Sequence, residues 1–241
     1  TFFSQNYHNV NRYNKTTIMQ LKHLLKTIGL MVMAVLLLNA NTTFAQNGKW
    51  AVESDKNGIR VESMLETGHT YKTYKGSMTV KANDGDVIEV MRNINGYVDW
   101  MYNTIDAKLI HPKASGGVVD ANVFTENDTY DFYIYTVNEA SPLQDRDLVS
   151  KATMRKKGEN RVELVMQSVP DYIGEDHNYT RVHEFSGQWV FENIDDNQIK
   201  ITYQIYTDPR ISAWIPGVTG QVNTNSFDTV YKTLTKMREK F

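Results

Sequence analysis

The last part of the chain, residues 215–241, places large apolar side chains at spacings of three to five: Val222, Phe227, Val230, Leu234, Met237 and Phe241. This pattern predicts one long amphipathic helix. Pro216 suits its first turn, because a proline lacks the N–H that would have no partner there. Such a helix extends to roughly 35–40 Å and needs a broad apolar surface to cover. We expect it to close a curved sheet as a lid; an ordinary helix packed on a solid core is the alternative.

Between residues 71 and 207 the chain mostly alternates apolar and polar positions, which is typical of half-buried strands. The expected strands are 59–63, 71–81, 107–111, 121–126, 130–137, 147–157, 161–169, 181–192 and 198–207. Turn-forming Gly, Asn and Asp separate neighbouring strands, as at 156–160 and 193–197, and predict antiparallel hairpins. Short helical segments are expected at 50–55, 84–94 and 98–101, and a loop at 112–117. The predicted fold class is therefore α+β.

Alternation also assigns faces to the expected sheet. Extending the register of strand 181–192 backwards places Arg181 and His183 on its inner face. A buried guanidinium is costly unless it is paired or meets a polar ligand head, so Arg181 either anchors such a head or lies in water at the strand's open end. The other residues expected to line an apolar tunnel of roughly 300–1,000 Å³, or else to fill a solid core, are Tyr133, Tyr135, Leu148, Ala152, Met154, Leu164, Met166, Phe185, Trp189, Tyr203, Val222, Phe227 and Val230.

Residues 19–45 show the pattern of a secretory signal peptide. Lys22 and Lys26 precede an apolar run over 28–38, and Thr43 and Ala45 stand at small-residue cleavage positions. The run is 11 residues long, whereas a spanning helix needs roughly 20, so an uncleaved membrane anchor is the weaker alternative. We therefore expect export, to the periplasm or the medium.

Residues 1–18 precede Met19, are polar and lack periodicity, so we interpret them as a non-native upstream extension. Residues 46–241 are expected to form a single domain. Removing residues 1–45 takes away four basic residues and no acid, which moves the formal charge from −2 to −6. A negative chain does not favour nucleic acid as a partner. The sequence holds no cysteine, so the exported fold is expected to hold without disulfides.

The sequence carries no signature of cofactor or metal chemistry. None of the four histidines that follow residue 45 has a second ligand at metal-site spacing: His69, His111, His177 and His183. Glycine-rich phosphate loops, Gly-x-Ser-x-Gly turns and cysteine nucleophiles are also absent from the sequence. We therefore expect no cofactor, no metal and no catalytic residue.

Several motifs, in order, match the pattern of a known family. Pro-Leu-Gln-Asp-Arg-Asp-Leu-Val at 142–149 precedes a strand, and Tyr-Thr-Asp-Pro at 206–209 is followed by Trp-Ile-Pro at 214–216 and Asn223. The same order includes Trp50, Asp-Lys-Asn-Gly-Ile at 55–59, Tyr-Val-Asp-Trp at 97–100, Arg181 and Gly-Gln-Trp at 187–189. With these motifs the chain resembles the START family, the StAR-related lipid-transfer domains, over nearly all of residues 46–241.

The resemblance implies the helix-grip fold, in which a long antiparallel sheet curls around a C-terminal helix and leaves a deep apolar tunnel. It implies a lipid, sterol-like or isoprenoid ligand held for transfer or sensing, with transient membrane contact, and it leaves the oligomeric state open. Arg146 and Asp147 are expected to fix the motif loop to its strand. Some members carry a tunnel arginine five residues after the motif's aspartate, where this chain has Ala152; Arg210 stands where a glycine usually follows Asp-Pro.

An enzymatic alternative comes with the same resemblance, because related helix-grip proteins include aromatases and cyclases that use a tunnel Arg, Tyr or His for proton transfer. Arg181, His183 and Tyr203 are the residues of this chain that would serve. A general base must lie within hydrogen-bond reach of the reacting proton, so the test of this alternative is whether these side chains converge.

Overall fold

The computed structural model describes residues 48–110, 129–141, 143–211 and 215–241. These residues belong to one compact unit, 47–241. The expected signal peptide, strand 121–126, loop 112–117 and His111 lie outside the described residues. Among the helices within the described ranges, none is long and apolar enough to cross a membrane.

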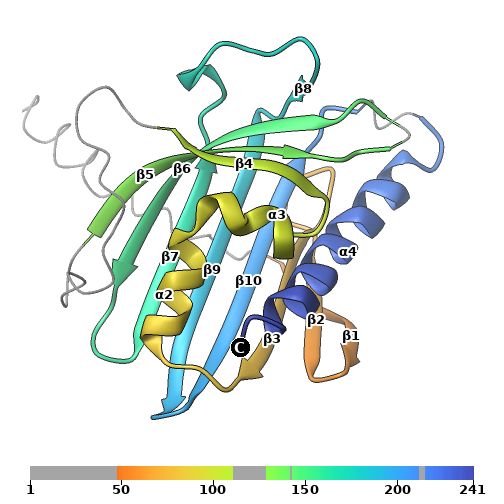
Figure 1. Cartoon of the computed structure of the whole chain (residues 1–241). Helices are drawn as coiled ribbons and strands as arrows, with labels where there is room; N and C mark the ends of the chain where they lie inside the picture. The colour runs from red at the N-terminus through yellow and green to blue at the C-terminus, as the bar shows by residue number, and fades with distance from the viewer. Residues whose placement is uncertain (1–47, 111–128, 142, 212–214) are drawn as a thin grey trace, which may run out of the picture. The chain divides into compact units, whose positions relative to one another are not determined.

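A ten-stranded sheet forms the main layer of the fold (Figure 1). Its order is β1-β2-β3-β10-β9-β7-β6-β5-β4, with antiparallel neighbours, and β8 pairs in parallel with β6. The bounds are β1 Ala51–Lys56, β2 Ile59–Met64, β3 Thr73–Val80, β4 Thr104–Ile110, β5 Thr129–Asn138, β6 Arg146–Lys156, β7 Arg161–Ser168, β8 Thr180–Arg181, β9 Glu184–Asp195 and β10 Gln198–Asp208. Apart from β1 and the break between β8 and β9, the described strands lie where alternation predicts them.

The first hairpin corrects one prediction. Residues 50–55 are not helical: β1 pairs with β2 across Asn57 and Gly58, whose φ angles are 53° and 69°. Two successive positive φ angles are what a two-residue type I′ hairpin turn requires. Most of β1 is exposed on both faces, so it carries no apolar alternation that would mark it as a strand.

Helices cover the concave face of the sheet (Figure 1). α2 Asp84–Arg92 begins with a capping box between Asn83 and Asp86, and η1 Ile94–Gly96 and α3 Tyr97–Trp100 follow it. α4 Val218–Arg238 packs against β2, β3 and β10, and the short turn η3 Pro170–Tyr172 lies between β7 and β8. The predicted arrangement, a curved antiparallel sheet held against a long C-terminal helix, is confirmed.

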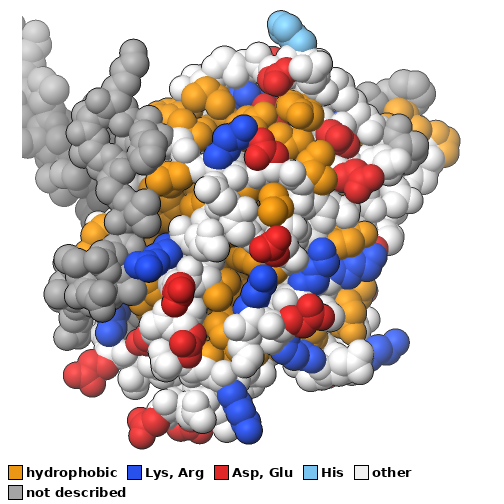
Figure 2. Space-filling model, viewed as in Figure 1, with side chains coloured by type: hydrophobic (Ala, Val, Ile, Leu, Met, Phe, Trp, Pro, Cys, Tyr) orange, Lys and Arg blue, Asp and Glu red, His pale blue; other side chains and the backbone are white. Residues whose placement is uncertain are grey.

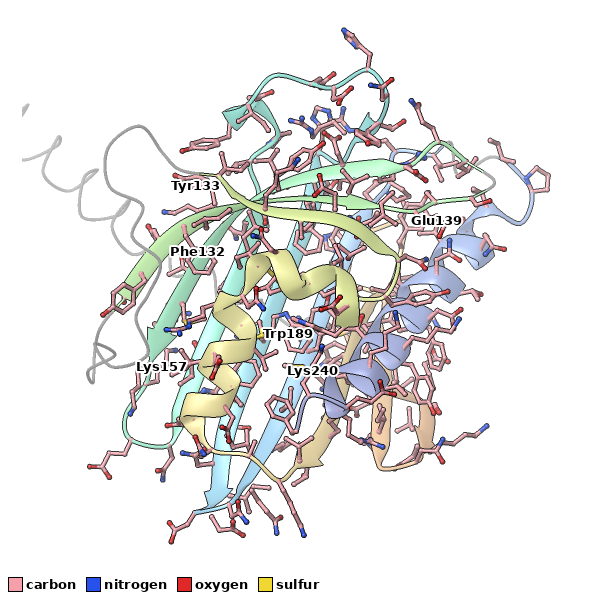
Figure 3. The ribbon with its side chains drawn as sticks, viewed as in Figure 1. Phe132, Tyr133, Glu139, Lys157, Trp189 and Lys240 are labelled. Atoms are coloured by element: carbon pink, nitrogen blue, oxygen red, sulfur yellow. The ribbon has the colours of Figure 1, made fainter. Side chains whose placement is uncertain are left out.

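An aromatic stack fills the middle of the concave face. Trp189 stacks on Tyr203 with ring centroids 3.8 Å apart and meets Trp100 of α3 edge-on at 5.7 Å. Tyr97 contacts Trp100 at 4.9 Å and donates its hydroxyl hydrogen to the Met91 carbonyl at 2.7 Å. Figure 3 shows Trp189 between the sheet and the α2–α3 segment. The core is therefore solid at this level of the sheet.

α4 is held most firmly along its C-terminal half, where Val230, Leu234 and Met237 are fully buried. Gly76 of β3 allows the helix to approach the sheet, because a Cβ there would lie 2.5 Å from Val230 Cγ1 and 2.6 Å from Leu234 Cδ1. The N-terminal half of the helix buries Val222 and Ser226 and leaves most of its other residues exposed or half-buried. One end of α4 is thus anchored and the other is lightly packed.

The start of α4 differs from the prediction. Val218 is its first residue, and Gly217 caps it with a φ of 83°, so Pro216 does not occupy its first turn. Gly220 is helical, and a Cβ there would meet nothing within 4 Å. The two glycines therefore have different roles.

Single alanine substitutions should separate these roles. Gly220→Ala is expected to raise the free energy of unfolding by about 1 kcal/mol, because alanine is the better helix former. Gly217→Ala is expected to lower it by about 1–2 kcal/mol, because an L side chain is strained at positive φ. Urea unfolding of each variant measures both values, and a gain from Gly217→Ala would contradict the left-handed cap.

Candidate functional site

A cavity of about 210 Å³ lies beside the N-terminal half of α4, at the end of the concave face beyond the aromatic stack. The ends of β5 and β10, the starts of β6 and β9, and the turn between α3 and β4 converge on it. From α4 it is lined by Val222, Asn225, Ser226 and Thr229. This cavity is smaller than the roughly 300–1,000 Å³ expected for a tunnel.

The cavity lining combines apolar side chains with polar groups of β5 and α4. Leu148, Val182, Phe185, Tyr203 and Ile205 are the apolar side chains on the sheet side. The polar lining groups of β5 are already hydrogen-bonded: the Asn138 side-chain oxygen accepts from the Thr104 hydroxyl at 3.0 Å, and the Asn138 side-chain amide donates to Thr136 at 3.3 Å. Thr229 donates to the Asn225 backbone carbonyl at 2.8 Å. Because these groups already have partners, the space between them suits a mainly apolar guest.

Four residues predicted to face a tunnel line this cavity: Leu148, Phe185, Tyr203 and Val222. The other inward residues of β6, β7, β9 and α4 lie in the solid core, namely Ala152, Met154, Leu164, Met166, Trp189 and Val230. Phe227 is partly buried against that core and meets the Tyr74 ring edge-on at 6.3 Å. The predicted faces of these strands match the structure, but the empty space is confined to one end.

Tyr133 and Tyr135 lie on the opposite face of β5 from the cavity. Tyr133 stacks on Tyr172 with ring centroids 4.0 Å apart, and Tyr135 packs in a separate cluster with Val149. Phe132, their neighbour, joins the main core instead, and Figure 3 shows Phe132 and Tyr133 on their strand. The predicted inner face of β5 is wrong. The segment around η3 buries the outer face, so apolar side chains occupy both faces of this strand.

Arg181 does not face the cavity either. The inner register of β9 does not extend back to it, because the strand predicted for 181–192 is interrupted between β8 and β9. The Arg181 guanidinium binds Asp147 Oδ2 through Nε at 3.0 Å and Nη2 at 2.8 Å, and both side chains are buried. It also donates to the carbonyls of Ile173 at 3.2 Å and Gly174 at 3.1 Å. Arg181 therefore ties the segment before β8 to β6.

The residues considered for proton transfer do not converge. His183 places Nε2 3.6 Å from Glu175 Oε1, Arg181 is bound to Asp147, and Tyr203 is held in the aromatic stack. Burial raises the pKa of the Tyr203 hydroxyl far above its ordinary value, so it stays protonated near neutral pH. Within the described ranges, no group of three or more His, Asp or Glu side chains is arranged to hold a metal ion.

Arg146 lines the cavity, whereas its motif predicts only a structural role for it. It opens β6 and lines the cavity with Leu148, two positions along the same face. Asp147 lies between them and points to the other face, where it binds Arg181. The expected structural role, fixing the motif loop to its strand, therefore belongs to Asp147. Strand alternation counted back from Leu148 places Arg146 on the inner face.

Solved structures of StAR-related lipid-transfer proteins match this arrangement. A fragment of the STAR-related lipid transfer protein from Xanthomonas axonopodis superposes with a TM-score of 0.65 and 25% identity. The match covers 79% of this chain and 97% of that fragment. Human STARD10 gives 0.62 at 20% identity, covering 79% and 72%, and human StAR-related lipid transfer protein 5 gives 0.59 at 13%, covering 89% and 94%. The chain has the START helix-grip fold.

Sequence comparison adds one distant relative. An uncharacterized protein of Pseudomonas aeruginosa is 24% identical over 168 residues, which cover 69% of this chain and 76% of the relative. No family model matches the chain. The START fold thus rests on the structure, and the function has to be argued from the cavity.

Proposed function

We propose that this START-fold chain binds one hydrophobic small molecule in the cavity beside α4 and holds it unchanged, for transfer or sensing outside the cytoplasm. The observation that carries the proposal is an apolar-walled cavity placed against the lightly packed end of α4. Solved structures of the same fold are named as lipid-transfer proteins, which supports a hydrophobic ligand. A lipid, a sterol-like compound or an isoprenoid is the expected class.

A non-catalytic role fits the position of the titratable groups better than an aromatase or cyclase role does. Arg181 and His183, two of the three candidates for proton transfer, do not line the cavity. Tyr203 does line it, but burial raises the pKa of its hydroxyl, so the tyrosinate that could act as a base is not populated near neutral pH and the hydroxyl is a weak acid. We therefore place binding, and no chemical conversion, in the cavity.

Native mass spectrometry of the protein purified from its own host tests the ligand and the compartment together. We expect a chain that begins near Gln46, recovered from outside the cytoplasm, and a co-purified apolar molecule that leaves intact on denaturation. The charged, apolar and small-residue order of residues 19–45 is the reason for the expected cleavage. A chain beginning at Met19 in the cytoplasm would contradict export, and turnover of an added aromatic substrate would contradict the non-catalytic role.

The exposed apolar side chains near the cavity lead us to propose transient membrane contact during loading. Leu143 lines the cavity with 49% of its surface exposed, and Ile215, in the connection to α4, is 42% exposed. Figure 2 shows hydrophobic side chains gathered beside the start of α4. A side chain of this size stabilises an apolar contact by about 1.5–3 kcal/mol when it is fully buried.

Ile215→Asp should therefore slow transfer of a fluorescent lipid between vesicles by about tenfold without changing equilibrium binding of that lipid. A matched control is Ile105→Asp on β4, because Ile105 is 52% exposed and does not line the cavity. Stopped-flow transfer assays measure both rates. Equal slowing by the two variants would contradict contact at the start of α4.

A further inference from the structure

We infer that the cavity selects a single-chain or otherwise compact amphiphile with one negative charge, such as a monocarboxylate, and that Arg146 binds its head. This inference rests on the proposed function and names the ligand class of the same site. Arg146 and Asn138 are cross-strand partners at the ends of β6 and β5, and both line the cavity. The next pair on that face, Leu148 and Thr136, continues the lining toward the aromatic stack.

The guanidinium of Arg146 has hydrogen-bonding capacity to spare. A guanidinium carries five N–H donors. Arg146 donates to the Gln144 carbonyl, and no carboxylate of the described residues lies within 4.0 Å of it. By contrast, Arg181 is bound to a buried carboxylate and to backbone carbonyls. A cation that is partly removed from water and lacks a carboxylate partner is the complement of an anionic head group.

Two carboxylates near Arg146 set the charge balance of the site. Burial lowers the pKa of the Arg146 guanidinium, which the adjacent Asp145 carboxylate partly offsets, and the side chain stays cationic at neutral pH. Asp145 is itself engaged, since its Oδ1 accepts the Ala140 N–H at 3.1 Å. Glu139 also lines the cavity, but it is exposed, so water and salt screen its repulsion of a bound anion. Removing the Glu139 charge should strengthen anion binding slightly.

The size of the cavity limits the apolar part of the ligand. An engineered apolar cavity of about 150 Å³ accommodates benzene. The volume of about 210 Å³ found here is moderately larger, and Leu148, two positions from Arg146 on the same face of β6, begins its apolar lining. This space fits one short chain or one compact ring system, with the charged head at Arg146. A two-chain lipid does not fit the cavity as it stands.

Isothermal titration of the delipidated full chain with three ligands of equal chain length tests the inference: decanoate, 1-decanol and decylammonium. We expect decanoate to bind about tenfold or more tighter than decanol, and decylammonium to bind most weakly, because hydrogen bonds to charged groups are the strong ones. Arg146→Gln should weaken decanoate binding about tenfold or more, toward the level of decanol, and should change decanol binding much less. Glu139→Gln should strengthen decanoate binding, and Arg238→Gln, beyond the lining residues of α4, should change nothing.

The outcomes separate the ligand class from the proposed function. Equal binding of decanoate and decanol by the wild-type chain would overturn the role of Arg146 while leaving hydrophobic binding intact. Binding of none of the three ligands, with no displacement of a neutral apolar dye, would overturn both. The wild-type ranking needs no variant, so a folding defect in Arg146→Gln cannot mask the result; Arg146→Lys should retain part of the preference for decanoate.

Discussion

Arg181→Met should lower the free energy of unfolding by about 3–5 kcal/mol, the range found when one partner of a buried ion pair is removed. Asp147 would then stay buried with one oxygen, Oδ1, already without a hydrogen-bond partner among the described residues. The backbone carbonyls of Ile173 and Gly174 would lose their donor as well. Urea unfolding followed by circular dichroism measures the loss, and hydrogen exchange should show the segment around η3 opening first.

The double variant Asp147→Leu, Arg181→Met distinguishes the cost of an unpaired buried charge from the cost of losing the link between β6 and the segment before β8. It should recover most of the stability, because apolar groups of similar volume can replace a buried pair at little cost. Lys151→Met is the matched control, since Lys151 pairs with Asp131 at the surface, with 40% and 45% of the two side chains exposed. Exposed pairs contribute about 0–1 kcal/mol, so a similar loss in this control would contradict the special role of Arg181.

The faces of the sheet were predictable wherever one face meets water. In β10, Ile199, Ile201 and Tyr203 are buried in the core and Lys200 is exposed, so alternation gives the correct face. In β5 both faces are apolar, because Tyr135 belongs to the cluster under the η3 segment while Phe132 belongs to the core. Alternation cannot distinguish two buried faces. The same pattern therefore works for one strand and fails for the other.

The candidate site was only partly predictable, because empty space depends on packing between distant segments. Phe185 and Trp189 are inward-facing residues of the same strand, yet Phe185 lines the cavity and Trp189 fills the core. The difference arises from Trp100 on α3, whose ring reaches Trp189 from 89 positions earlier in the sequence. Periodicity identifies the inward face of a strand, but it does not show which part of that face is covered by an aromatic side chain from a distant segment.

Ser226→Phe should reduce binding of a neutral apolar dye by about tenfold or more, because a buried side chain of α4 would then occupy much of the cavity of about 210 Å³. The same change should leave the free energy of unfolding unchanged or raise it by about 0.5–2 kcal/mol, as cavity-filling substitutions do. Fluorescence titration with 1-naphthylamine, a single compact ring system that is neutral at pH 7, measures the first effect, and urea unfolding measures the second.

Thr224→Phe is the matched control for Ser226→Phe, since Thr224 is exposed two residues away on α4 and does not line the cavity. It adds the same aromatic bulk to the same helix, so it should bind the dye as the wild-type chain does. If the space beside Ser226 is instead closed by tight packing, the phenyl ring would strain the core and cost about 1–3 kcal/mol. A destabilised Ser226→Phe variant that still binds the dye normally would place the ligand elsewhere.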